Sequence, residues 1–273
     1  MTIIDAHCHI FPEKIAGAAV NATQSFYAGV KTPVSIPIED IPHHVGTPGD
    51  LLACEKQAGI SRCLVFSTAT KAGQVSTVND FIASECRKHP EFIGAGTMHP
   101  DFPDFEAECD RMLRLGLRGI KIHPDIQGFA MDDVRILPLY EIMQEKHMFL
   151  IAHTGDYRFD FSGPARALHA ASLFPRLRFV CAHFGGWSQW EDAIAMLNRE
   201  NIYVDTSSTI AYAGDTLSRR AFSAYDPTHI FFGTDYPMWT PSRELALVKS
   251  LGLDEDFLDG VFHRNFEEFL NTL

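Results

Sequence analysis

The sequence has little positive charge and no long apolar run. Its 23 Lys and Arg residues stand against 35 Asp and Glu residues, which gives a net charge of -12. Recognition of nucleic-acid phosphates or anionic lipids needs a concentrated basic face, so this balance disfavours both partners. Nowhere do about 18 apolar residues run together, and no basic and apolar leader precedes the first strand-like run. We therefore expect a soluble, cytoplasmic protein that binds neither nucleic acid nor membranes.

Paired cysteine motifs, linkers and repeats are absent as well. The six cysteines form no C-x-x-C pair, and Cys8, Cys63 and Cys181 lie in strand-like runs, where cysteine behaves as a small buried apolar residue. Reduced thiols of this kind fit the cytoplasm. The chain contains no low-complexity tract and no solenoid repeat. With 273 residues and 46% hydrophobic content, it is expected to form one domain over residues 1–273.

Apolar runs typical of strands alternate with stretches typical of helices. The expected strands are Ile3–His9, Arg62–Ser67, Phe92–Met98, Gly119–His123, Phe149–His153, Arg178–His183, Ile202–Asp205 and Ile230–Gly233. The helix-like stretches are Thr47–Ala58, Ser76–His89, Asp104–Leu115, Val134–Lys146, Gly163–Phe174, Trp187–Arg199 and Ser242–Leu251. This alternation implies parallel strands, and about eight of them in this length predict a TIM-type (β/α)8 barrel, an α/β fold.

Two segments are additional to the strands and helices of a plain (β/α)8 barrel. Residues from Phe11 to Gly46 form a proline-containing stretch far longer than a normal loop between a strand and its helix. Such loops lie over the mouth of the barrel, so we expect a lid or pocket wall, the alternative being a surface excursion with its own short helix. Asp254–Leu273 is expected to form a terminal amphipathic helix that closes the bottom or flank of the barrel.

Polar residues that can bind a metal follow several of the strand-like runs. They are His7 and His9 in IIDAHCH, His153 in FLIAH, His183 in RFVCAH and Asp235 in IFFGTD. A parallel barrel presents its catalytic groups at the carboxyl ends of its strands, so these side chains should meet at one rim. Strand alternation puts Asp5, His7 and His9 on the inward face. It puts Ile4, Ala6 and Cys8 on the outward face. In the fifth strand it puts His153 on the inward face together with Ile151. In the sixth strand it puts His183 on the inward face together with Phe179 and Cys181.

The residue types indicate a divalent metal site. Imidazoles and a carboxylate are the ligands expected for zinc, with manganese and iron as alternatives. We assign His7, His9, His153 and Asp235 as the ligands of one metal ion. A catalytic site keeps one position open for water, which leaves His183 beside that water as a general acid/base or a hydrogen-bond donor.

The motifs as a set resemble the amidohydrolase superfamily, and within it the amidohydrolase-related family that includes aminocarboxymuconate-semialdehyde decarboxylase. They are DAHCH at 5–9, GIKIHP at 119–124, IAHTG at 151–155, CAHFGG at 181–186 and GTDYP at 233–237, and they span nearly the whole chain. The resemblance implies metal binding at the positions of His7, His9, His153 and Asp235, and a catalytic role at that of His183. It also gives a modest expectation of a homodimer.

Lys121 and His123, in GIKIHP, share the inward parity of their strand, and an inward lysine is costly unless it is paired or functional. Three interpretations stay open. The resemblance allows a carboxylated Lys121 that bridges two metals. Alternatively, Lys121 or His123 binds an anionic group of the substrate. Finally, Lys121 is neutralised by Asp5 or another carboxylate inside the barrel.

Two further residues are assigned to substrate binding. Arg158, in the loop after the fifth strand, is suited to a bidentate contact with a substrate carboxylate, although surface arginines are common. Trp187, together with Tyr236 and Trp239, follows the sixth or eighth strand and can wall an apolar pocket. Packing against helices explains these aromatic residues equally well.

The predicted function is hydrolysis of a small molecule with an amide, ester or lactone carbonyl by a metal-activated water. Asp235 would accept the proton of that water and pass it to the leaving group, while His183 helps to stabilise the oxyanion. Non-oxidative decarboxylation of a small carboxylic acid is the alternative, because the resembled family contains decarboxylases. A TatD-like nuclease and a non-catalytic metal-binding protein are more distant alternatives.

Overall fold

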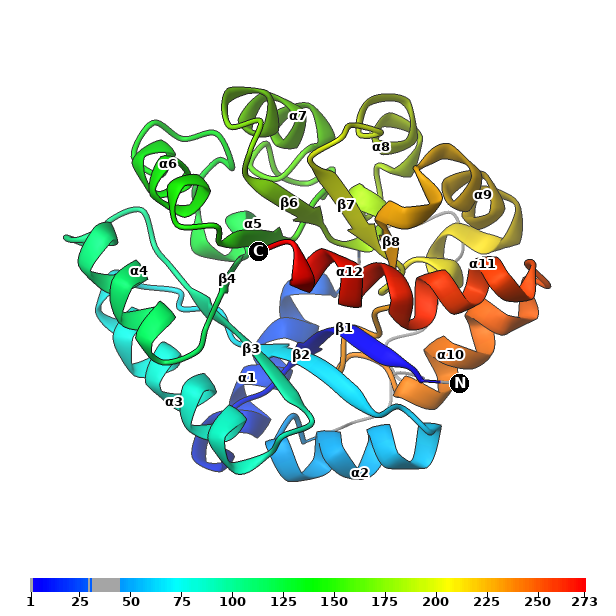
Figure 1. Ribbon diagram of the computed structural model, residues 1–273, viewed down its shortest axis with the longest axis horizontal. Helices are drawn as coiled ribbons and strands as arrows, with labels where there is room; N and C mark the ends of the chain where they lie inside the picture. Colours follow the sequence, from blue (N-terminus) through cyan, green and yellow to red (C-terminus); the bar gives the residue numbers. More distant parts are fainter. Residues whose placement is uncertain (1, 29, 31–44) are drawn as a thin grey trace.

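The computed structural model describes residues 2–28, 30 and 45–273, and within them eight parallel strands form a barrel with helices around it (Figure 1). The strands are β1 (Ile4–His9), β2 (Arg62–Phe66), β3 (Phe92–Thr97), β4 (Gly119–Ile122), β5 (Phe149–Ala152), β6 (Arg178–Cys181), β7 (Ile202–Asp205) and β8 (Ile230–Phe231). They pair in chain order. Backbone hydrogen bonds from Ala6 to Phe232 (2.8 Å) and from Asp235 to His7 (2.9 Å) join the last strand to the first. The predicted (β/α)8 barrel is confirmed.

The helices of the described residues follow the strands around the barrel. They are α1 (Glu13–Tyr27), α2 (Pro48–Ala58), α3 (Val75–Lys88), α4 (Phe105–Arg114), α5 (Pro124–Gln127), α6 (Leu137–Glu145), α7 (Pro164–Leu173), α8 (Trp190–Met196), α9 (Ile210–Ala224), α10 (Pro241–Ser250), α11 (Glu255–Asp259) and α12 (Asn265–Asn271). Short 3₁₀ turns are η2 (Ala72–Gln74), η3 (His183–Gly185) and η4 (Pro227–His229), and η5 (Gly260–Arg264) is a π-helical turn. No helix in this part of the chain is long and apolar enough to span a bilayer.

Local signals in the sequence set several of the helix ends. The Thr47 side chain accepts a hydrogen bond from the backbone N–H of Asp50 (3.3 Å) and begins α2, and Gly59 ends that helix in the left-handed conformation. Asp104 caps α4 in the same way, by accepting from the backbone N–H of Ala107 (3.0 Å). Because these caps are local, the predicted bounds of both helices lie within a residue or two of the observed ones.

The segment between Phe11 and Gly46 contains a helix of 15 residues, α1, where the sequence predicted mainly an extended loop. Residues 31–44 of that segment lie outside the described residues. The terminal segment Asp254–Leu273 was predicted correctly as a helical closure. Phe266 and Phe269 of α12 pack with Phe149 and Phe231 inside one end of the barrel. Figure 1 shows α12 crossing that end in front, with α1 lying behind the strands.

The predicted alternation of β1 is wrong in its first half. Ile4 and Ala6 pack in the barrel interior, whereas Asp5 lies on the outer side with Cys8 and Glu55. The pairing with β2 is irregular between Asp5 and Cys8, where β1 has one residue more than its partner. Such a β-bulge shifts the following side chains to the opposite face. His7 and His9 therefore face the interior because of the bulge, and not because of a regular alternation from Asp5.

The alternation predicted for β6 is wrong too, while that of β5 is right. Val180 packs inside the barrel, and Phe179 and Cys181 pack outside it. His183 reaches the barrel mouth because the chain turns after the strand, with His183 at φ +62° and Phe184 at φ +50°. These left-handed conformations are uncommon for residues other than glycine and often occur at functional sites. In β5, Ile151 lies inside as predicted.

A buried polar network ties β3 to the helices outside it. The Asn79 side chain accepts from the backbone N–H of Thr97 (2.7 Å) and donates to Glu108 (2.7 Å), which also accepts from Nε of Arg111 (2.9 Å). Burial by itself would raise the pKa of Glu108, but the hydrogen bonds from Arg111 and Asn79 outweigh it and lower that pKa. The ionised carboxylate therefore stabilises the fold.

This network predicts a defined pH dependence of stability. Because its pKa is lower in the folded state, Glu108 contributes stability above its ordinary pKa of 4.5 that is lost as the pH falls through the folded-state value. We expect Glu108→Gln to lower the free energy of unfolding at pH 7, and the difference from the wild type to disappear as the pH falls through the lowered pKa of Glu108. Urea unfolding across pH 3–7 measures this. Glu106→Gln, whose side chain is 70% exposed, is the control, and parallel curves for Glu108→Gln and the wild type would contradict the expectation.

Candidate metal centre and substrate pocket

The carboxyl ends of the strands open into a pocket of about 380 Å³. Six of the residues singled out from the sequence line it: His9, Lys121, His123, His153, His183 and Asp235. One wall comes from α1, through Val20, Thr23, Phe26 and Tyr27 among others. The prediction that the segment after the first strand forms a lid or pocket wall is thus confirmed for α1. Polar groups lie at the floor of the pocket and mostly apolar side chains form its walls.

Three of the four predicted ligands lie together at the pocket floor. Oδ1 of Asp235 is 3.4 Å from Nε2 of His7 and 3.5 Å from Nε2 of His9, and the ligand atoms of all three lie within 4.8 Å of one another. Ser208 donates a hydrogen bond to Oδ2 of Asp235 (2.5 Å), and Nε1 of Trp239 donates to Ser208 (2.8 Å). This chain of hydrogen bonds orients the carboxylate and leaves Oδ1 toward the two imidazoles.

The fourth predicted ligand, His153, lies next to His183 rather than within this compact group. Nδ1 of His153 is 3.0 Å from Nε2 of His183. On its other side, Nδ1 of His183 lies 2.8 Å from Oγ and 3.1 Å from the backbone carbonyl of Ser207. His9, His153 and His183 line the same pocket, and the ring of His7 lies beneath them with its centre 5.1 Å from that of His183.

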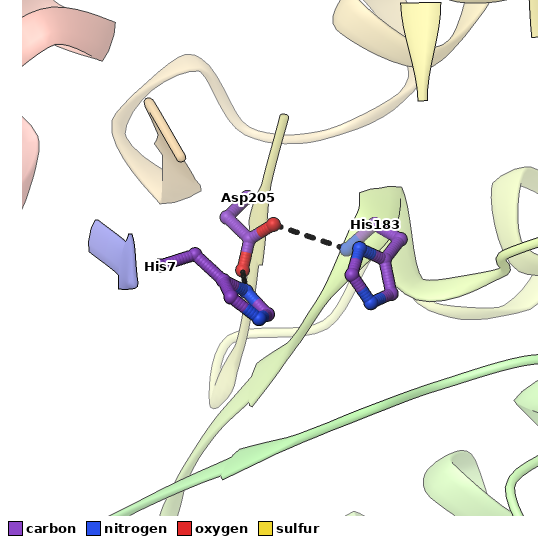
Figure 2. Close-up of side chains that lie close together, drawn as sticks. All are labelled: His7, His183 and Asp205. Atoms are coloured by element: carbon purple, nitrogen blue, oxygen red, sulfur yellow. Dashed lines mark hydrogen bonds and ion pairs between the residues drawn. The ribbon is translucent and has the colours of Figure 1, made fainter. Parts of the chain in front are cut away.

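Asp205, which the sequence analysis did not single out, connects two of the histidines. Its Oδ2 accepts from Nδ1 of His7 (2.9 Å), and its Oδ1 accepts from the backbone N–H of His183 (3.1 Å). Figure 2 shows the carboxylate between these two residues. Asp205 is fully buried and ends β7, so the signal that could have identified it is an acidic residue closing an apolar run, as for Asp235. The Asp205 contact places the proton of His7 on Nδ1 and leaves Nε2 with a lone pair toward the pocket.

The tautomer of His183 follows from its neighbours. Ser207 donates its hydroxyl proton to Asp205, and the backbone carbonyl of Ser207 can only accept. Nδ1 of His183 must therefore carry the proton that these oxygens accept. In its neutral form, the ring presents an unprotonated Nε2 to the pocket.

Burial keeps the site's imidazoles neutral. It is the largest cause that lowers the pKa of His7 and of His9, and the charge of Lys121 lowers both further. Burial also lowers the pKa of His183 to about 4. For Asp235, burial by itself would raise the pKa, but the contacts with His9 and His7 outweigh it and hold the pKa well below its usual range. Neutral imidazoles beside an ionised carboxylate are the donor set that a divalent cation prefers, so these residues fit a metal.

Lys121 is fully buried at the pocket floor. Its Nζ is 3.2 Å from Nε2 of His7 and lies 4.9 Å from the ring centre of Phe66. Burial lowers the pKa of Lys121 to about 8, against the opposing attraction of Asp205 and Asp235. Asp5, which the sequence analysis suggested as its partner, lies on the outer face of β1 and accepts from the backbone N–H of Thr234 (3.0 Å). Asp5 is therefore not that partner, while neutralisation of Lys121 by another carboxylate and the other two interpretations stay predictions.

The remaining predicted substrate residues have different surroundings. His123 lines the pocket, stacks on His153 (4.1 Å between ring centres) and is bonded through Nε2 to the hydroxyl of Tyr27 (2.6 Å). Trp187 packs edge-on against Tyr27 and lines a side recess of about 30 Å³ beside His183 and Asp235. Sequence reasoning missed Tyr27, because it treated its segment as a loop.

The guanidinium of Arg158 donates its hydrogen bonds to other groups of the protein. Its Nη2 donates to Asp156 (2.7 Å), its Nε donates to the same carboxylate (3.0 Å), and its Nη1 donates to the backbone carbonyl of Phe26 (2.6 Å). The guanidinium lies over the rings of Phe26 and Tyr27. In this arrangement Arg158 fixes the end of α1 over the pocket, and its contact with substrate stays a prediction.

Comparison with known proteins gives one family and one fold. A family model described as Amidohydrolase matches residues 4–272. The chain is similar to an uncharacterized TIM-barrel protein from Bordetella bronchiseptica, with 18% identity, a TM-score of 0.76, and 100% of this chain and 99% of that chain covered.

Two further solved structures have names that state an activity. A 5-carboxyvanillate decarboxylase from Novosphingobium aromaticivorans, solved with bound manganese, has 17% identity and a TM-score of 0.74, with coverage of 99% and 97%. A putative 2-pyrone-4,6-dicarboxylic acid hydrolase from Pseudomonas putida has 16% identity and a TM-score of 0.70, with coverage of 99% and 98%. At these identities the likeness shows the barrel fold.

Proposed function

Because the chain belongs to the amidohydrolase family, whose model matches residues 4–272, we propose that it is a metal-dependent hydrolase of a small molecule with an amide, ester or lactone carbonyl. The observation that carries the proposal is the group of His7, His9 and Asp235 at the floor of the pocket, with their ligand atoms within 4.8 Å of one another. Burial keeps its imidazoles neutral and therefore able to bind a cation.

His7, His9 and Asp235 would hold the metal, with His153 as the fourth ligand. A divalent cation in this position supplies a Lewis acid that polarises a carbonyl and lowers the pKa of water. Zinc fits the imidazole and carboxylate donors, and manganese or iron(II) are alternatives. Manganese is supported by its presence in the related decarboxylase structure. A second metal ion would require carboxylation of Lys121.

The side chains at the pocket floor divide the proton transfers between them. Ser208 holds Oδ2 of Asp235, so Oδ1 is the oxygen placed to accept a proton from the attacking water. His183 presents an unprotonated Nε2, which can take a proton and then donate it to the oxyanion or leaving group. Asp205 and Ser207 hold that ring in the required tautomer.

The pocket supports a substrate with an apolar body and an anionic group. Phe11, Val20, Phe26 and Met238 are among its apolar wall residues, and Lys121 is the lysine among the described lining residues, which include no arginine. A carboxylate beside Lys121 would gain a charge-assisted hydrogen bond in a water-poor site. His123, held by Tyr27, is placed to bind the same end of the substrate.

The test of the proposal is a substrate screen in ¹⁸O-labelled water. Protein purified without chelators should contain about one divalent metal ion per chain, and a chelator should remove both metal and turnover. Lactones, esters, amides and aromatic carboxylates are offered, and products are analysed by mass spectrometry. We expect one solvent oxygen in the organic product. Protein that binds no added zinc, manganese or iron would sink the proposal.

Non-oxidative decarboxylation is the second candidate. The apolar walls and the buried Lys121 suit an aromatic carboxylate as well as they suit a lactone, and one of the similar structures is a decarboxylase by name. The same screen separates the two reactions. Release of carbon dioxide from an aromatic acid, with no solvent oxygen in the organic product, would replace hydrolysis with decarboxylation.

A further inference from the structure

Behind His153, on the side away from His183, lies a buried carboxylate that the mechanism above does not use. Oδ2 of Asp125 is 3.8 Å from Nε2 of His153, and the two side chains are 0% and 3% exposed. Among the described residues, neither Nε2 of His153 nor Oδ1 of Asp125 has a hydrogen-bond partner. A buried ring nitrogen without a partner thus lies beside a buried carboxylate that has one unpaired oxygen, an arrangement that costs free energy.

The tautomer of His153 explains this arrangement. Nε2 of His183 is unprotonated, so the 3.0 Å contact between it and Nδ1 of His153 requires the proton of His153 to lie on Nδ1. With that proton, Nδ1 cannot bind a cation. To become a ligand through Nδ1, the neutral ring must carry its proton on Nε2 instead. Asp125 is the carboxylate next to that atom.

We propose that Asp125 is a positioning residue, which accepts a hydrogen bond from Nε2–H of His153 and thereby holds the tautomer whose Nδ1 is free for the metal. The inference rests on the proposed metal site. His7 offers a parallel at the other side of the pocket, since Asp205 accepts from its Nδ1 at 2.9 Å and leaves Nε2 free. A ligating histidine that donates its other N–H to a carboxylate is a common arrangement at metal sites.

The surroundings favour this role over that of a ligand for a second cation. Asp156, the third member of the group, already accepts from Nε and Nη2 of Arg158 and is neutralised by it. Ser162 donates to Oδ2 of Asp125 (2.6 Å) and fixes the carboxylate on the side of His153. The group therefore retains one uncompensated carboxylate, Asp125, which is too little charge for a second divalent ion but is an acceptor in place for one N–H.

The experiment measures the Zn²⁺ affinity of metal-stripped protein by competition with a chelating dye. Asp125→Ala should raise the dissociation constant about 10- to 100-fold. Asp125→Asn keeps an oxygen acceptor and should lie closer to the wild type, which guards against a variant that merely folds poorly. Asp132→Ala removes the carboxylate partner of His169, a pair that does not line the pocket, and should leave the affinity unchanged.

A double-mutant cycle tests whether Asp125 acts through His153. In a His153→Ala background, Asp125→Ala should produce no further loss of Zn²⁺ affinity. A further loss of the full factor would overturn the inference, as would wild-type affinity in Asp125→Ala. If the wild type bound two zinc ions per chain and Asp125→Ala bound one, Asp125 would be a metal ligand, and the inference would be overturned as well. Failure of the wild type to bind Zn²⁺, Mn²⁺ or Fe²⁺ at all would instead refute the proposed function.

Discussion

Replacing Asp235 with asparagine is expected to lower kcat by about 100- to 10,000-fold while the barrel stays folded. Asparagine cannot take the proton that Oδ1 of Asp235 accepts in the proposed reaction. It preserves the rest of the environment, because its side chain can still accept from Ser208 and its backbone can still donate to His7. Asp235 has φ +62°, a conformation that asparagine tolerates better than most residues. The variant therefore replaces the charged Oδ1 with an amide NH2 group and keeps the surrounding hydrogen bonds.

The measurement is kcat on a substrate from the screen, together with metal content and the unfolding midpoint. Ser208→Ala is the matched control, because it removes the group that orients Asp235 but leaves the carboxylate, and should lose less activity. Lost turnover with retained metal assigns Asp235 to proton transfer. Metal lost in parallel assigns it mainly to binding. A rate near that of the wild type would show that Asp235 has neither role.

Replacing Arg158 with alanine is expected to destabilise the fold by about 3 kcal/mol, the low end of the loss seen when one partner of a buried ion pair is removed. Asp156 is 0% exposed and would keep a charge with no cation beside it, while Arg158 itself is 22% exposed. The variant would also free the carbonyl of Phe26 and the face of its ring. The end of α1 should then loosen over the pocket.

Urea unfolding gives the free energy, and limited proteolysis reports on α1. Arg135→Ala is the comparison, because Arg135 is 49% exposed and pairs with Asp133 and Asp101 at the surface, where an ion pair contributes about 0–1 kcal/mol. We expect a larger loss of stability and earlier cleavage within α1 for Arg158→Ala. Equal losses for the two variants would mean that the Arg158 contacts do not fix the end of α1.

The sequence singled out residues that the structure brings close together, but it gave the wrong reason for the inward position of three of them. His7 and His9 face the interior because of a bulge between Asp5 and Cys8, and His183 does so because of a left-handed turn after β6. Both features break the two-residue period on which a strand pattern rests. Asp5–Cys8 contains neither glycine nor proline that would mark the bulge, and in the turn after β6 the left-handed residues His183 and Phe184 precede Gly185 and Gly186.

The helix α1 shows another limit of the sequence pattern. Its residues Val20, Thr23, Phe26 and Tyr27 recur at three- and four-residue steps and line the pocket, a helical pattern that the interpretation of this segment as a loop overlooked. The prolines that follow it suggested a loop. Only the folded chain shows that Tyr27 reaches His123 from this helix.

The sequence by itself determined the alternation of strands and helices, the barrel, and the histidines and aspartate at its mouth. It could do so because apolar periodicity, helix caps and strand ends are local features of the chain. The tertiary structure decided which of these groups touch. Asp205 meets His7 across 198 residues and Tyr27 meets His123 across 96, and Asp125 lies behind His153. Such pairs depend on how the barrel closes, and hence on the packing of the whole chain, which no local pattern encodes.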